Sequence, residues 1–142
     1  MSAYCTDEVV LAQGVRYDIV MILNEDRNNA HYQIQSFSPG KLIVNNELYT
    51  TSVIITPSQL IQNWSPRNID HITDDDFKPF LSLQPKIILL GTGDRSKILP
   101  AQKLALLLEK QFHVECMNTA AACRTYMALS AEGRNVAAGL IL

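Results

Sequence analysis

The segment Gly91-Thr92-Gly93 follows an apolar run and is the part of this sequence that most invites a chemical role. Glycines after a buried strand let backbone amides approach an anion, and a following helix N-terminus adds partial positive charge. However, a dinucleotide-binding loop needs a third glycine where Ser96 stands, and a P-loop needs Gly-Lys-Ser/Thr. The next helix is expected only from Pro100, too far away to help. We therefore interpret the segment as a sharp turn.

Basic and hydroxyl side chains nevertheless gather at the ends of two predicted strands. The loop from Gly91 to Leu99 contains Arg95 and Lys97, and the turn at Met117–Thr119 leads into a helix that carries Arg124. Open α/β sheets place their clefts at the carboxyl ends of parallel strands. The sequence thus predicts a cleft that accepts an anionic group from a small molecule or from a partner's acidic side chain. Its candidate residues are Gly91, Thr92, Gly93, Arg95, Thr119 and Arg124.

Structural roles compete for the same kinds of side chain. The preferred interpretation of Arg124 is an internal ion pair with Glu115 or Glu132. Trp64, the only tryptophan, is expected to anchor a loop on the core rather than to stack on a ligand, because an indole buries a large apolar area.

No recognised catalytic or metal-binding motif is present. Cys5, Cys116 and Cys123 are odd in number and form no CxxC pair, so neither a disulfide framework nor a zinc knuckle is indicated. His113 and Cys116 form a lone HxxC, which supplies too few ligands for zinc. Nucleophile-elbow, HExxH and paired-carboxylate motifs are absent. We predict no metal, no cofactor and no catalytic residue, which favours a non-enzymatic protein.

The strand before the turn organises the second half of the chain. Ile87 to Leu90 are all apolar, so this strand should be buried on both faces, as a central strand covered by helices is. The predicted order is β-α-β-α-β. After the first strand come a helix over 101–112, a strand over 114–117, a helix over 120–129 and a strand over 136–142.

The two predicted helices differ in how they should pack. In the 101–112 helix, Leu104, Leu107 and Leu108 fall opposite a polar stripe and should face the sheet. In the 120–129 helix, Thr119 is the expected N-cap, the early alanines allow close approach to the strands, and Gly133 supplies a left-handed C-cap.

The first half reads as an antiparallel β-meander followed by short helical pieces. Pro39-Gly40 and Asn45-Asn46 are turn sequences between apolar runs, and Pro57 should end the last strand because it lacks an amide hydrogen. The predicted strands are Tyr32–Phe37, Lys41–Val44 and Leu48–Ile55, then a helical turn over 58–64 and a helix that Thr73 and Asp76 begin as a capping box.

Composition limits the class of protein. A chain of 142 residues with 47% hydrophobic residues suits one core. The formal net charge of -2 argues against a nucleic-acid binder. No apolar run reaches the ~18 residues of a membrane span and no signal sequence is apparent, so we expect a cytoplasmic protein with no membrane insertion.

A family resemblance covers about residues 30–142. Pro85–Gly93, Val114–Tyr126 and Glu132–Ala138, together with the strand order of Tyr32–Trp64, strongly resemble a small Mth-type α/β domain family of unknown function. Its members include a mitochondrial respiratory complex I assembly factor and a human adipogenesis-associated protein. The resemblance implies a three-layer domain with a central mixed sheet. It implies no established catalytic residues.

The resemblance also sets the functional expectations. Two positions depart from the usual pattern, because Met127 stands in place of asparagine and Lys86 in place of an acid. We expect a bacterial, non-enzymatic domain at 30–142, with 1–29 as an N-terminal extension, that binds a protein partner and acts as an assembly factor for a respiratory or membrane complex. A second copy of the chain is a further candidate partner. The alternative is a small anionic-ligand-binding protein or weak enzyme that uses the cleft at the strand ends.

Overall fold

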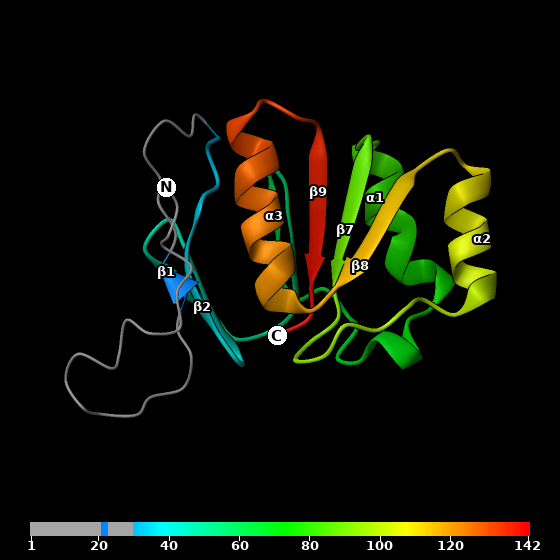
Figure 1. Cartoon of the computed structure of the whole chain (residues 1–142), viewed down its shortest axis with the longest axis horizontal. Helices are drawn as coiled ribbons and strands as arrows, with labels where there is room; N and C mark the ends of the chain where they lie inside the picture. Colours follow the sequence, from blue (N-terminus) through cyan, green and yellow to red (C-terminus); the bar gives the residue numbers. More distant parts are fainter. Residues whose placement is uncertain (1–20, 23–29) are drawn as a thin grey trace.

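The computed structural model describes residues 30–142 and, as backbone only, residues 21–22 (Figure 1). The sequence also suggests short strands at Val9–Leu11 and Tyr17–Leu23. The second of these segments contains the described strand β1, at Met21–Ile22, whereas Val9–Leu11 and Cys5 lie outside the described residues.

A five-stranded mixed sheet forms the centre of the molecule, in the order β6-β5-β9-β7-β8. β7 pairs in parallel with β8 and β9, whereas β5 pairs antiparallel with β9 and β6. This confirms the predicted α/β fold with a central mixed sheet. The strands are β5 at Val53–Ile55, β6 at Leu60–Ile61, β7 at Ile87–Gly91, β8 at His113–Met117 and β9 at Val136–Leu140.

The strand β7 is buried along its whole length, as the unbroken apolar run predicted. Ile87 and Leu89 contribute to the hydrophobic core on one face of the sheet, whereas Ile88 and Leu90 contribute to the core on the other face. Its two neighbours come from later in the chain, so the β-α-β-α-β order of the second half is also confirmed.

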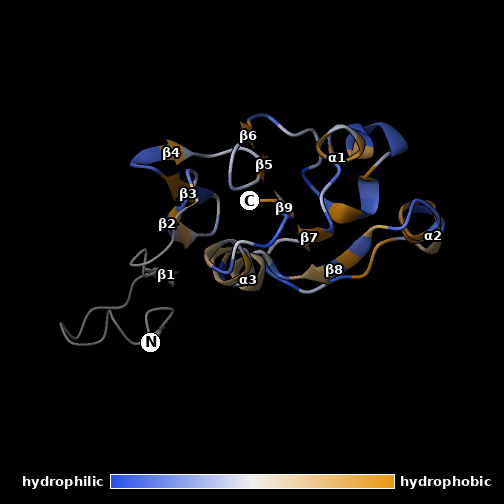
Figure 2. Ribbon diagram, turned by 90° about the horizontal axis from the view of Figure 1, so that it is seen from above, coloured by the Kyte–Doolittle hydropathy of each residue, from blue (hydrophilic) through white to orange (hydrophobic). Residues whose placement is uncertain are grey.

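Helices cover both faces of this sheet (Figures 1 and 2). The helix α3, Thr119–Ala131, packs on one face through its small and apolar residues. On the other face lie α1, Lys78–Leu83, and α2, Ala101–Glu109, preceded by the short 3-10 helices η2, Ile69–His71, and η3, Asp74–Phe77. The mixed sheet is thus the middle of three layers.

The predicted meander forms a second, four-stranded antiparallel sheet beside α3, in the order β1-β2-β3-β4. Helix α3 links the two sheets, because the Tyr126 hydroxyl donates a hydrogen bond of 2.7 Å to the carbonyl of Tyr32. The Ile34 amide donates to the Met127 sulfur at 3.2 Å, so this methionine has a structural contact. The remaining strands are β2 at Ile34–Ser38, β3 at Lys41–Val44 and β4 at Glu47–Tyr49.

The prediction of one strand over Leu48–Ile55 is wrong. The chain instead leaves the small sheet after β4 and enters the mixed sheet at β5. The Ser52 hydroxyl donates to the Pro66 carbonyl at 2.7 Å, and the Trp64 amide donates to the Ser52 carbonyl at 2.8 Å. These long-range bonds fix the break between the strands.

The predicted helical turn over 58–64 is also wrong, since this segment contains β6. The Thr56 hydroxyl accepts from the Gln59 amide at 2.8 Å, and the Thr56 amide donates to the Gln59 carbonyl at 2.8 Å. A tight turn at Pro57 therefore sends the chain back along β5.

Two predicted element ends and the orientation of one side chain need smaller corrections. Helix α2 ends at Glu109 rather than at residue 112, and Gln111 has a positive φ of 69°. Leu108, expected to face the sheet, is 53% exposed. The last strand ends at Leu140. Helix ends depend on local backbone geometry that apolar spacing does not report.

The expected caps are present at two other places. The Asp76 carboxylate accepts from the Thr73 amide at 2.8 Å and from the Thr73 hydroxyl at 3.1 Å, as a capping-box acid does. Gly133 ends α3 with a φ of 77°. Both sequence signals are confirmed.

Trp64 is a core residue, as the structural interpretation predicted. Its side chain packs edge-on against Phe80, with ring centroids 5.8 Å apart, and its indole N–H donates to the Asp76 carbonyl at 2.9 Å. Gly139 of β9 lies beneath it. A Cβ atom at Gly139 would come within 2.7 Å of two Trp64 ring carbons.

Candidate functional site

The turn Gly91–Gly93 links the ends of three strands. The Thr92 amide donates to the Met117 carbonyl at 2.8 Å, at the end of β8, and the Gly91 carbonyl accepts from the Ile141 amide at 3.0 Å, just beyond β9. The Gly93 amide donates to the Thr119 hydroxyl at 2.8 Å. The amides of Thr92 and Gly93, which an anion would need, already have acceptors within the protein.

Thr119 is the fixed point of this arrangement. Its side chain is 0% exposed, and its hydroxyl accepts from the Gly93 amide while donating to the Ile141 carbonyl at 2.6 Å. Its own amide donates to the Gly93 carbonyl at 2.9 Å. Thr119 is therefore the first residue of α3 and not its N-cap. Asn118 is the N-cap, and its side-chain oxygen accepts from the Ala121 amide at 2.8 Å.

Gly91 permits the close approach of α3 to β7. A Cβ atom at Gly91 would lie 3.0 Å from both the Cα and the hydroxyl oxygen of Thr119, and 3.2 Å from the Cβ of Ala122. The glycine at this position thus has a packing reason. Gly93 has a different one, because its φ of 99° suits glycine best.

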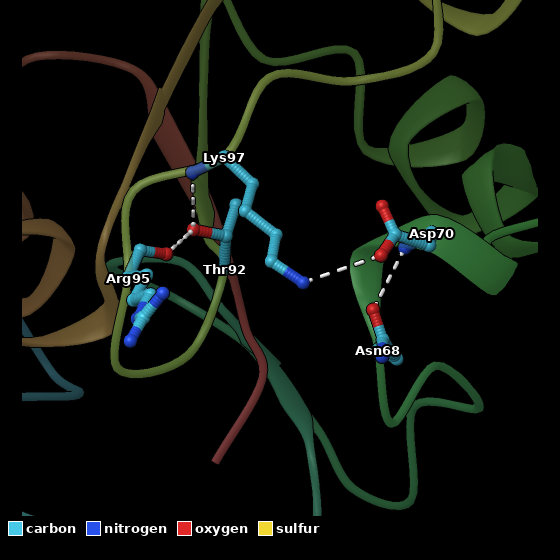
Figure 3. A network of polar contacts seen from close by, with 5 residues as sticks. All are labelled: Asn68, Asp70, Thr92, Arg95 and Lys97. Carbon is cyan, nitrogen blue, oxygen red and sulfur yellow. Dashed lines mark hydrogen bonds and ion pairs between the residues drawn. The ribbon is translucent and has the colours of Figure 1, made fainter.

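The loop after the turn folds around the Thr92 hydroxyl (Figure 3). This hydroxyl lies 2.6 Å from the Arg95 carbonyl and 3.1 Å from the Met117 carbonyl, and it accepts from the Lys97 amide at 3.1 Å. The Lys97 ammonium extends across to the Asp70 carboxylate of η2 at 3.2 Å. These contacts fix the course of residues 92–97 and leave the Arg95 side chain exposed.

Ile98 follows this fixed segment and is 78% exposed. Among the large apolar side chains of residues 30–142, it is more exposed than Leu48 or Leu108. We call residues 91–99 the Ile98 loop. Ile98 follows the exposed Arg95 and the Asp70-paired Lys97 in this loop.

Arg124 lies on the exposed side of α3. Its two predicted partners, Glu115 and Glu132, each contact another residue. His113 Nε2 lies 2.8 Å from the Glu115 carboxylate, and Arg134 lies 3.7 Å from that of Glu132. The predicted cleft around Gly91, Arg95 and Arg124 stays a prediction.

A cleft that the sequence did not predict opens at the same edge of the mixed sheet, where β9 ends. It has a volume of about 570 Å³, and none of the predicted site residues lines it. The residues around it are Thr50, Thr51, Ser52, Asn63, Trp64, Ser65, Arg67, Ile141 and Leu142. Asn63 adopts a φ of 56° and accepts from the Thr51 hydroxyl at 3.0 Å. The cleft joins three distant segments, so no local motif announces it.

Burial disfavours the ionised form of two groups in the described part of the chain. Burial raises the pKa of the Cys116 thiol, and burial also raises the pKa of the Tyr126 phenol. A nucleophilic cysteine needs the opposite shift. Within residues 30–142, no group of three or more His, Cys, Asp and Glu side chains could hold a metal ion. No described helix is long and apolar enough to cross a membrane.

These features define a class of protein: an α/β domain whose mixed sheet lies between helices, with an antiparallel sheet beside it and hydrogen-bonded turns at the strand ends. Residues 34–141 match the family model described as "Protein of unknown function (DUF498/DUF598)", and the chain belongs to this family. The resemblance deduced from Pro85–Gly93 and the later motifs is thereby confirmed.

Relatives in the family carry different names. A human protein named NADH dehydrogenase (ubiquinone) 1 alpha subcomplex assembly factor 3 is 31% identical over 124 residues, which cover 86% of this chain and 66% of the human protein. The chain thus spans about two thirds of that relative's length. A Francisella tularensis protein named "13 kDa major membrane protein" is 27% identical over 123 residues, covering 86% of this chain and 100% of that protein.

Solved structures share the fold. The NMR structure of a Xanthomonas campestris protein superposes with a TM-score of 0.72 and 32% identity, covering 85% of this chain and 92% of the other. This agreement confirms the architecture predicted from the family resemblance.

Proposed function

We propose that this chain is a non-enzymatic protein-binding domain that serves as an accessory factor in assembling a respiratory or membrane complex. The observation that carries the proposal is Ile98, an isoleucine 78% exposed at the end of a loop segment held by internal hydrogen bonds. The name of the human relative, a complex I assembly factor 31% identical over 86% of this chain, supports the same role.

The fixed shape of the Ile98 loop matters more than exposure alone. Single exposed apolar residues are ordinary on protein surfaces. Here, however, the Thr92 hydroxyl holds the segment that precedes Ile98, so binding would cost little conformational entropy. An apolar anchor in the same loop as the exposed Arg95 suits a partner with an apolar pocket and a carboxylate at its rim.

The proposal also concerns domain and location. Residues 30–142 would form a single domain with 1–29 as an extension, which the family match at residues 34–141 supports. We expect the chain to be cytoplasmic and to meet its partner at a membrane surface. The Francisella relative, named a major membrane protein, supports a role close to a membrane.

The test replaces Ile98 and compares captured proteins. Ile98→Asp is expected to abolish retention of specific partners when the purified full chain is used as bait and bound proteins are quantified by mass spectrometry. A charge at the anchor cannot enter an apolar pocket without a large desolvation cost. The melting temperature should be unchanged, because Ile98 packs little against the fold.

The matched control is Leu48→Asp, at another exposed apolar residue on β4. Partners retained by the wild type and by this control, but lost by Ile98→Asp, would support the proposal. Equal retention by all the proteins, or no reproducible partner, would contradict it.

The 570 Å³ cleft favours a second candidate function, the binding of a small anionic ligand. Arg67 supplies a cation, and the hydroxyls of Thr50 and Ser65 supply hydrogen-bond donors, which together suit a phosphate or carboxylate. The hydroxyls of Thr51 and Ser52 donate within the protein. Its position at the carboxyl end of β9 agrees with where open α/β sheets bind ligands.

Thermal-shift measurements with pyrophosphate, phosphosugars and small carboxylates test this second candidate. A ligand at 100 times its Kd should stabilise the wild type by about 2.7 kcal/mol and raise its melting temperature. Arg67→Ala should lose the shift, whereas Arg124→Ala should keep it. Loss only in Arg124→Ala would place the ligand at the cleft predicted from the sequence, and no shift with any compound would remove the proposal.

A further inference from the structure

The strand β8 forms one end of the mixed sheet and pairs only with β7 among the described strands. The His113 amide donates to the Lys86 carbonyl at 3.4 Å, and the Met117 carbonyl accepts from the Thr92 amide at 2.8 Å. In a parallel ladder, main-chain groups of alternate residues face the same neighbour. Those of Val114 and Cys116 therefore face away from β7, at the open edge. Such an edge is a template for another strand.

Side chains along β8 divide cleanly between its two faces. Val114 and Cys116 are half-buried and pack against the core on the side of α1 and α2. His113 and Glu115 are exposed on the other face, and their side chains reach each other at 2.8 Å. Unlike the two-residue β6 at the other end of the sheet, β8 is five residues long and pairs with β7 in regular register.

Helix α2 adds an apolar surface on the same side. At about 100° per residue, Ala101, Ala105 and Leu108 fall within an arc of about 60°, and all three are exposed. Lys103 projects almost opposite this arc and contacts the Asp74 carboxylate of η3. The apolar arc therefore points away from η3, and α2 lies at the end of the sheet that β8 forms (Figure 2).

The side chains of β8 select a partner with the same sequence. The main-chain groups of Val114 and Cys116 face the open edge. In an antiparallel pair, these residues must lie opposite residues of the added strand whose main-chain groups also face its open edge. Placing Val114 opposite Cys116 of a second copy would set the two Glu115 carboxylates against each other, which is unfavourable. Placing Val114 opposite its own copy sets His113 of each chain opposite Glu115 of the other. These pairs fall at non-hydrogen-bonded positions, where side chains lie closest.

We propose that β8 is the interface through which two copies of this chain associate, antiparallel and across a two-fold axis at Val114. The two mixed sheets become one continuous sheet. Two His113–Glu115 contacts cross the axis on one face, and the apolar residues of β8 and α2 meet on the other. The Ile98 anchor proposed for the partner protein lies outside β8, in the loop before α2.

Two substitutions on β8 that introduce charges of opposite sign test both the interface and its register. His113→Glu sets like charges against Glu115 of the other copy, and Glu115→Lys sets an ammonium against His113. Analytical ultracentrifugation of the full chain should give twice the mass of 15.9 kDa for the wild type and a single mass for each variant alone. Mixing the two variants in equal amounts should restore the double mass, because every cross-strand contact is then favourable.

Controls of the same charge change are Glu132→Lys and His71→Glu, both exposed and outside β8, and both should remain dimeric. A wild type that stays monomeric across the concentration series overturns the proposal. So does a dimer that survives either β8 substitution, or a mixture that stays monomeric. Ile98→Asp should remain dimeric, so failure of the proposed partner binding and failure of the β8 interface give different results.

Discussion

Replacing Thr119 with valine is expected to lower the free energy of unfolding by about 2–4 kcal/mol, measured by urea denaturation. Valine keeps the shape of the side chain but removes the hydroxyl. The Ile141 carbonyl then loses a buried donor at 2.6 Å, and the Gly93 amide loses its acceptor at 2.8 Å. Leaving buried polar groups unpaired costs more than an average hydrogen bond is worth.

The control is Thr119→Ser, which keeps the hydroxyl and removes only a methyl group. It should recover most of the stability that Thr119→Val loses. If valine and serine destabilise the protein equally, packing rather than hydrogen bonding explains the role of this residue. If valine costs nothing, the proposed link between the Gly93 turn and the end of β9 has no energetic weight.

Replacing Gly139 with alanine is the second large effect, with an expected loss of about 1–3 kcal/mol in the free energy of unfolding. The added Cβ would meet two Trp64 ring carbons at 2.7 Å and a Phe80 ring carbon at 3.0 Å. These rings are buried in the core, so neither moves aside without disturbing its neighbours. The indole N–H also donates a hydrogen bond to the Asp76 carbonyl, which a shift of the ring would break.

A double-mutant cycle with Trp64→Phe identifies the cause. Phenylalanine lacks the two indole carbons that the new Cβ would touch, so Gly139→Ala should cost less in the Trp64→Phe background than in the wild type. An equal cost in both backgrounds would mean that backbone effects in β9, and not the contact with Trp64, make glycine necessary. The stability of each variant would be compared by the same denaturation curves.

The sequence predicted the parts of the fold that single segments determine. The unbroken apolar run of Ile87–Leu90 is enough to indicate a doubly buried strand, and the capping residues Thr73 and Asp76 bond to each other locally. In both cases the residues that give the sequence signal are the same residues that form the strand or the cap. The alternation of strands and helices after Pro85 followed from the same kind of signal.

Long-range contacts explain most of what the sequence missed. The strand break at residues 50–52 depends on bonds from Ser52 to Pro66 and from Trp64 to Ser52, and β6 exists because it pairs with β5. Neither contact leaves a periodic trace in the sequence. The 570 Å³ cleft escaped for the same reason, since residues 50–52, 63–67 and 141–142 come together only in the folded chain.

The sequence located the strand ends on which the candidate site rests, whereas the cleft itself stays a prediction. Gly91 and Met117 do end neighbouring parallel strands, as the predicted cleft required. The spacing could not show that Thr119 would use its hydroxyl inside the protein, because a threonine before a helix is equally typical of an N-cap. Asn118, one residue earlier, carries the capping signal that would have separated the two roles.

The position of β9 between β5 and β7 has a consequence for synthesis on the ribosome. The strands on either side of it emerge well before it does, yet among the described strands they have no pairing with each other. Until residues 136–140 leave the exit tunnel, the nascent chain holds two parts of the sheet that are not yet joined. The apolar surfaces that β9 later covers stay exposed to water. The strand β9 must therefore be synthesised before the two parts can become one sheet.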